Sequence, residues 1–189
     1  MRDGMTNGKQ TSVHWNTPRK YVSLIYDFFD EVELDPCSNE YSILDAKTKI
    51  KLPQDGLMEE WSNKTIFINP PYGRDAQRKT SIKDWIQKAW ESYSKYSNEI
   101  LMLIPVSTNT THWKNFIFGK ASICFLYDSR LKFALNGNED NKGAPMACCF
   151  VYYGEQESRF EDLFSSYGFV VTKRRDNDSN HKSERVRTE

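Results

Sequence analysis

The segment Thr65–Tyr72 constrains the fold of this chain more than any other stretch. Its first four residues are β-branched or aromatic, a composition that is typical of a buried strand. The next four are Asn69, Pro70, Pro71 and Tyr72, and proline cannot donate a hydrogen bond within a central strand. We therefore expect the chain to leave a sheet at Asn69 through a rigid turn. Such a turn either has only a structural role or binds a ligand. In the second case it presents the Asn69 carboxamide, the Pro70 carbonyl and the Tyr72 ring to a planar ligand with an exocyclic amine.

Length, charge and cysteine content narrow the class of protein. A chain of 189 residues fits one domain. Its 26 basic and 26 acidic side chains cancel, so binding to nucleic acid would depend on a local basic patch. The sequence has neither a signal peptide nor a long apolar run, and we expect a soluble cytoplasmic protein with no membrane partner. Four cysteines without a Cys-x-x-Cys pair, and only three histidines, predict reduced thiols and no metal site.

Apolar periodicity predicts an α/β domain between two polar ends. Residues 1–12 and 173–189 are polar or charged and are predicted to be disordered, which leaves 13–172 as the folded domain. Helices are expected at 18–29 after an N-cap at Thr17, at 81–96, and from a capping box that begins at Ser158. The apolar run 99–106 predicts a strand buried on both faces. Alternating strands and helices are typical of a mainly parallel central sheet with helices on both faces.

Four polar residues are expected at or near the ends of strands. They are Asp35, Asp55, Asn69 and Ser107. Ligands of α/β sheets bind outside the carboxyl ends of the strands, so this shared placement predicts one composite site.

The tetrapeptide Asn69-Pro70-Pro71-Tyr72 resembles the catalytic motif of S-adenosylmethionine-dependent amino-methyltransferases, chiefly the adenine-N6 DNA enzymes. Further segments stand in the order of that class: Thr17-Pro18 at a helix start, Asp35-Pro36-Cys37 at a strand end, and Asp55-Gly56-Leu57 followed by Trp61. The whole series resembles the small phage-type DNA adenine methyltransferases. One departure is that Ser38-Asn39-Glu40 stands where the family usually has a glycine.

This resemblance implies a single Rossmann-like methyltransferase domain that binds S-adenosyl-L-methionine and double-stranded DNA. It implies direct methyl transfer to the N6 amine of an adenine flipped out of the duplex, in an enzyme of phage or prophage origin acting in a bacterial cell. The residues implied for catalysis are Asn69, Pro70, Pro71 and Tyr72. Those implied for the cofactor are Trp15, Thr17, Asp35, Pro36, Cys37, Asp55 and Asn69, with Asn39 and Asp45 as alternatives for the ribose contact.

Basic and polar residues around the expected turn are candidates for contact with DNA. The loop 73–80 follows the turn at once, and its positive side chains either grip phosphates or form a solvated surface. The candidates are Arg74, Arg78, Lys79, Ser107, His112, Arg130 and Lys132. Alternative substrates for the same chemistry are RNA adenine, the N4 amine of cytosine and protein glutamine, and a catalytically idle DNA-binding protein is the alternative outside the enzymes. The sequence makes no prediction of oligomeric state.

Overall fold

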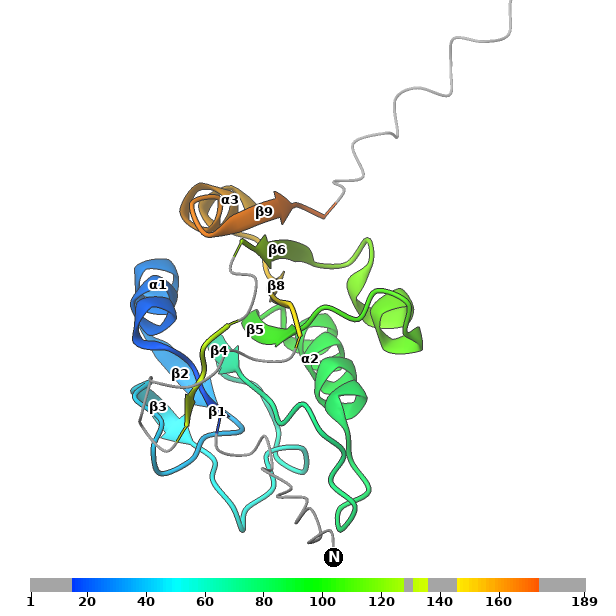
Figure 1. Ribbon diagram of the computed structural model, residues 1–189. Coiled ribbons are helices and arrows are strands. Elements are labelled where there is room, and N and C mark those ends of the chain that lie inside the picture. Colours follow the sequence, from blue (N-terminus) through cyan, green and yellow to red (C-terminus); the bar gives the residue numbers. More distant parts are fainter. Residues whose placement is uncertain (1–14, 128–130, 136–145, 174–189) are drawn as a thin grey trace, which may run out of the picture.

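A computed structural model describes residues 15–127, 131–135 and 146–173. It is a mixed α/β structure in which helices flank one large sheet (Figure 1). The strands of the large sheet are β2 (Val32–Asp35), β3 (Ala46–Lys49), β4 (Thr65–Ile68), β5 (Glu99–Pro105), β6 (Ser122–Leu126), β8 (Cys148–Tyr153) and β9 (Gly168–Val171). The helices are α1 (Arg19–Phe29), α2 (Ile82–Tyr96), the π-helix η2 (Trp113–Ile117) and α3 (Glu157–Phe164). The ends that were expected to be disordered, 1–12 and 173–189, lie outside the described residues except for Lys173.

The large sheet has seven strands in the order β3-β2-β4-β5-β8-β6-β9. The pairings from β3 to β5 are parallel, and those from β5 to β9 are antiparallel. The α/β class is therefore confirmed, but the sheet is mixed rather than mainly parallel. The difference arises because β8 runs between β5 and β6 in the opposite direction. A strand buried on both faces has the same apolar pattern in either direction, so periodicity does not report the orientation of β8.

Helices cover both faces of the sheet, as expected. Alternate strand residues face opposite sides, so Cys148, Phe150 and Tyr152 pack toward α1 and α3. Cys149, Val151 and Tyr153 belong to the second apolar cluster, which holds α2 and η2. All four cysteines are free thiols. None of the described helices is long and apolar enough to cross a membrane.

Helix boundaries follow the local capping signals only in part. The helix α2 begins after Ser81, close to the predicted start, and Ser81 and Asp84 form a reciprocal capping box that the sequence analysis did not predict. At α3 the prediction is wrong, because the helix begins at Glu157 after Gln156 rather than after Ser158. The Gln156 N–H donates to the Tyr152 hydroxyl (2.8 Å), and this bond fixes the N-cap two residues earlier in the chain. Gly168, which follows α3 in the chain, is the first residue of β9.

Lys173 belongs to the folded domain and not to the charged tail in which the sequence places it. Its ammonium donates to the Gly154 carbonyl at 2.9 Å. It also forms ion pairs with Glu155 (3.2 Å) and with Glu157 (3.0 Å). Because the Glu157 side chain is only 8% exposed, this ammonium supplies the partner that a buried carboxylate needs.

Candidate active site

The carboxyl ends of β2 and β4 create a cavity at one edge of the sheet. The two strands are parallel neighbours through Leu34 and Ile66, so the loop after β2 and the turn after β4 leave the sheet side by side. A cavity of about 310 Å³ opens between them. It is lined by Trp15, Pro36, Cys37, Ser38, Asn39, Ile50, Leu52, Gln54, Asp55, Gly56, Asn69, Pro71, Gly73, Arg74, Asp75, Ala76, Arg78 and Trp85.

Asn69 is held in one orientation at the start of the turn. Its Nδ2 donates to the Trp15 carbonyl at 3.0 Å and to the Thr17 Oγ1 at 3.2 Å. Both amide hydrogens are thus engaged, and the acceptor Oδ1 is the atom left for a ligand. Thr17 was expected to cap α1, but it makes no capping hydrogen bond because Pro18 occupies the N-cap position. Its hydroxyl positions Asn69 instead.

Tyr72 lies in an aromatic group rather than on the cavity wall. Its hydroxyl donates to the Leu103 carbonyl at 3.1 Å. Its ring meets Trp15 and Phe133 edge-on, with centroids 6.1 and 5.6 Å away, and Trp15 stacks on Phe133 at 5.4 Å. Burial raises the pKa of the Tyr72 hydroxyl well above its ordinary value. The group is therefore a neutral, apolar surface beside the turn.

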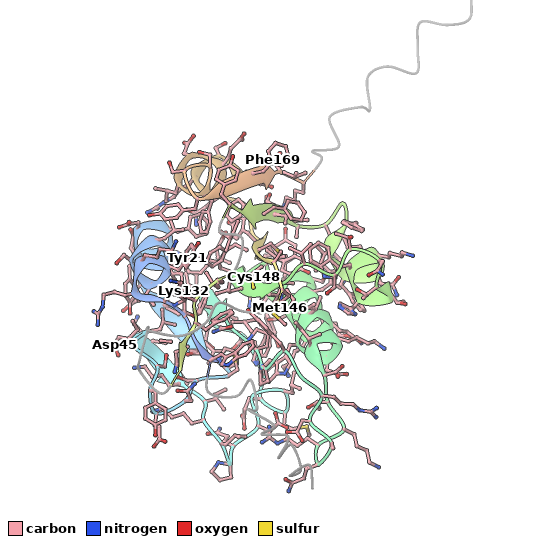
Figure 2. All side chains as sticks on the ribbon, viewed as in Figure 1. Tyr21, Asp45, Lys132, Met146, Cys148 and Phe169 are labelled. Carbon is pink, nitrogen blue, oxygen red and sulfur yellow. The ribbon has the colours of Figure 1, made fainter. Side chains whose placement is uncertain are left out.

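A two-stranded sheet brings this aromatic group together. The strand β1 (Trp15–Asn16) pairs antiparallel with β7 (Ala134–Leu135). The pairing carries Phe133, which follows Lys132 in the sequence, to the Asn69–Tyr72 turn from more than sixty residues away. Lys132 itself is exposed (Figure 2), and Arg130 lies outside the described residues.

Asp35 lies behind the cavity wall, in a position more buried than its predicted contact with the cofactor requires. Its Oδ1 accepts the Cys37 N–H at 3.2 Å. Burial raises the pKa of its carboxyl from 3.8 to about 6, although the Cys37 N–H, the Ser38 and Cys37 side chains and Lys49 all oppose the shift. Cys37 does line the cavity. Burial, and then the adjacent Asp35, raise the pKa of its thiol well above 9.0, so it stays protonated.

The Asp55–Leu57 segment forms the wall opposite Pro36. Asp55 Oδ1 accepts the Leu57 N–H at 3.0 Å, and the Trp61 indole donates to the Gly56 carbonyl at 2.8 Å. A Cβ on Gly56 would meet the Pro36 carbonyl oxygen at 1.8 Å. Only glycine therefore lets the two loops approach this closely.

The residues expected to bind DNA do not gather in one place. Arg74 and Arg78 line the cavity, and the loop that carries them closes around Asp75. Asp75 forms an ion pair with Arg78 at 3.5 Å, and its N–H donates to the Thr80 carbonyl at 2.9 Å. Lys79, in the same loop, is exposed.

Ser107 lies in the loop after β5, and His112 directly precedes η2 as its N-cap residue. Neither is part of the cavity lining. The Ser107 carbonyl accepts the Thr110 hydroxyl at 2.7 Å, and the same hydroxyl lies 3.1 Å from His112 Nε2. Burial, and then Lys83, lower the pKa of His112. Sequence reasoning gives these two residues the same role as the basic loop, but the structure places them apart from the cavity.

Sequence reasoning missed much of the cavity wall. Of the two alternatives for the ribose contact, Asn39 lines the cavity. Asp45 is 91% exposed beside Lys49 and lies at the outer side of β3 (Figure 2). The missed lining residues include Ser38, Gln54, Asp75 and Trp85. Of these residues, only Ser38 could have been proposed from the sequence as part of the site, because it directly follows the Asp-Pro-Cys segment.

Comparison with known proteins places the chain in a family. Residues 5–180 match the model of the family described as DNA N-6-adenine-methyltransferase (Dam). The chain belongs to this family. Membership in the Dam family implies DNA adenine N6-methyltransferase activity and confirms the resemblance that the four motifs indicate. Comparisons with curated proteins and with solved structures gave no match.

Proposed function

We propose that this Dam-family protein transfers a methyl group from S-adenosyl-L-methionine to the N6 amine of an adenine flipped out of double-stranded DNA. The observation that carries the proposal is the fixed orientation of Asn69. Its two amide hydrogens are engaged by Trp15 and Thr17, so its Oδ1 is positioned to accept a hydrogen from an amine. Methylation of an exocyclic amine requires a hydrogen-bond acceptor at this position.

The cavity fits the proposed cofactor in size and in the chemistry of its wall. Its volume, about 310 Å³, is within the usual range for small-molecule sites. Ile50, Leu52 and Trp85 supply apolar surface for an adenine ring, while Asn39 and Asp55 supply polar groups. When bound, the cofactor supplies an electrophilic methyl on a sulfonium. Trp15, Pro36, Cys37, Asp55 and Asn69 would hold it directly, with Thr17 and Asp35 supporting the wall from behind.

Asn69 and Pro70 prepare the amine of the substrate. The Asn69 Oδ1 and the Pro70 carbonyl accept its hydrogens, which draws the nitrogen lone pair out of conjugation with the ring and aims it at the cavity. The ring of Tyr72, braced by the Leu103 carbonyl, stacks on the flipped base. Positioning and fixed dipoles supply most of the rate enhancement, and the amine attacks without a covalent enzyme intermediate.

The protonation state of the cavity thiol favours direct attack by the substrate amine over a mechanism with a cysteine nucleophile. Methylation at carbon 5 of cytosine needs a thiolate nucleophile. Cys37 lines the cavity, but the pKa of its thiol is raised well above 9.0 by burial and by Asp35. A protonated thiol is a poor nucleophile, so this chain is suited to exocyclic amines.

The decisive experiment measures methyl transfer from isotope-labelled S-adenosylmethionine to unmethylated duplex DNA, followed by digestion to nucleosides. We expect labelled N6-methyladenine with the wild-type protein and none with Asn69→Ala, whereas Asn69→Ala still binds the cofactor in a calorimeter. The matched control is Asn115→Ala, which removes an exposed asparagine of η2 and should leave transfer unchanged. An active Asn69→Ala would contradict the assigned role. Label in RNA or protein alone would keep the chemistry and change the substrate.

A further inference from the structure

One lysine of α2 binds the main chain of the cavity wall from behind. The Lys88 ammonium donates to the Leu57 carbonyl at 2.7 Å, and it lies 5.3 Å from the centroid of the Trp61 ring. Leu57 stands two residues after Asp55, which lines the cavity and accepts the Leu57 N–H at 3.0 Å. Leu57 is thus held at its N–H by Asp55 and at its carbonyl by Lys88, so the ammonium anchors the end of this wall segment.

The position of this ammonium is electrostatically unfavourable. Burial lowers the pKa of Lys88, and the carboxylates of Glu91, Glu59, Asp55 and Glu60 only partly oppose the shift. Within the described part of the chain, the Lys88 hydrogen bond goes to a main-chain carbonyl and not to any of these carboxylates. A lysine that served only solubility would keep its charged end in water. Its placement against the Leu57 carbonyl therefore indicates a role in holding the wall.

The same face of α2 contacts the segment before β4 at two further points. Trp85 lines the cavity and stacks on Trp61, with ring centroids 6.0 Å apart and an angle of 24° between the planes. The Ser92 hydroxyl donates to the Trp61 carbonyl at 2.6 Å. Trp85, Lys88 and Ser92 follow the spacing of one helix face. Of these three contacts, only the one from Lys88 reaches the Asp55–Leu57 segment directly.

We propose that Lys88 is a positioning residue for cofactor binding, because its ammonium holds the Leu57 carbonyl and thereby keeps Asp55 in place in the cavity wall. Lys88 is not among the described residues that line the cavity, so it acts through the wall and not on the ligand. Asn69 is oriented separately, by Trp15 and Thr17. Loss of the ammonium should therefore weaken cofactor binding and leave methyl transfer itself intact. The inference rests on the proposed function, because it assumes that S-adenosylmethionine occupies the cavity.

The test removes the ammonium, keeps an apolar side chain in its place and measures binding of S-adenosylhomocysteine by calorimetry. We expect Lys88→Met to weaken binding about tenfold, because the charged hydrogen bond that anchors the wall is lost. Lys88→Arg keeps a charged donor and should restore most of the affinity. The matched control is Lys95→Met on the same helix, where the ion pair with Glu60 joins two exposed side chains. This control should bind like the wild type.

Steady-state methylation of duplex DNA separates this role from a purely structural one. Lys88→Met should raise the KM for S-adenosylmethionine about tenfold and leave kcat at saturating cofactor unchanged. A fall in kcat with unchanged KM would overturn the proposal. A lower Tm of the ligand-free protein with unchanged affinity would assign Lys88 to the fold alone and overturn it as well. If the wild type does not bind S-adenosylhomocysteine, the proposed function itself fails, whereas equal binding by wild type and Lys88→Met contradicts this inference alone.

Discussion

At the scale of single residues, the site contains side chains whose role differs from the one that the local sequence indicates. Thr17 carries a good N-cap signature, yet its hydroxyl accepts a hydrogen bond from Asn69, which is 52 positions away in the chain. A local pattern cannot show that a distant amide competes for the same oxygen. The chemical groups at Asn69 could thus be predicted from sequence, whereas the groups that orient them could not.

Replacing Thr17 by valine tests this orienting role. Valine keeps the shape of the side chain but removes the acceptor, so Asn69 can rotate and its Oδ1 loses its fixed direction. We expect kcat for DNA methylation to fall about tenfold with little change in cofactor affinity. Thr17→Ser keeps the hydroxyl and should restore most of kcat. If both variants behave alike in steady-state kinetics, Thr17 acts through packing and not through its hydrogen bond.

The sequence also predicted only part of the cavity lining. The cavity is lined by Trp15, Pro36, Cys37, Asp55 and Asn69, which the resemblance assigns to the cofactor. Asp35, predicted on the same grounds, lies behind the wall because the loop turns at Pro36 and its carboxylate binds the Cys37 N–H. Ser38 was noted only as a departure from the family pattern, since its place in the cavity lining depends on how the loop after β2 folds.

At the scale of elements, the cavity exists because two loops touch. Gly56 packs closely against the Pro36 carbonyl. This contact sets the distance between the loop after β2 and the segment before β4. The sequence marked Asp55-Gly56-Leu57 only as a segment that resembles the family, and only the fold shows that the glycine is needed for close approach. Likewise, strand positions could be predicted from apolar runs, whereas the place of β8 between β5 and β6 depends on pairings between distant segments.

Gly56→Ala should separate the two loops. The added methyl cannot avoid backbone at 1.8 Å, so we expect a loss of about 2 kcal/mol in the free energy of unfolding. The affinity for S-adenosylhomocysteine should fall with it. Urea unfolding and calorimetry measure the two effects.

Gly119→Ala is the matched control for this substitution. Gly119 has φ +72° with nothing near its missing Cβ, so alanine there costs about 1 kcal/mol from backbone strain alone. It should not alter ligand binding. Equal affinity in Gly56→Ala and the wild type would contradict the assignment of Gly56 to the cavity wall.

At the scale of the whole molecule, acidic and basic residues balance at 26 each, so individual buried groups determine how stability depends on pH. Asp35 is the clearest. Its carboxyl has a pKa of about 6 in the folded chain against 3.8 for an unperturbed group, chiefly because of burial. The folded state therefore binds this proton more tightly than the unfolded state, and the stability that Asp35 contributes is lost as pH rises from about 4 to about 6.

A comparison of wild type and Asp35→Asn should show this loss. The shift of about two pKa units corresponds to at most about 3 kcal/mol. We expect the wild type to lose up to that much stability, relative to Asp35→Asn, between about pH 4 and about pH 7, as measured by urea unfolding of the ligand-free proteins. Parallel pH profiles would show that Asp35 ionises as freely in the fold as in the unfolded chain.

The small sheet formed by β1 and β7 has a practical consequence for handling this protein. The Trp15 carbonyl in β1 orients Asn69, whereas Lys173 follows β9 at the far edge of the large sheet (Figure 1). An affinity tag or fluorescent label joined ahead of β1 is therefore close in the chain to the strand that orients the Asn69 amide. The same addition joined after β9 leaves that strand undisturbed and is the better choice for preparing active enzyme.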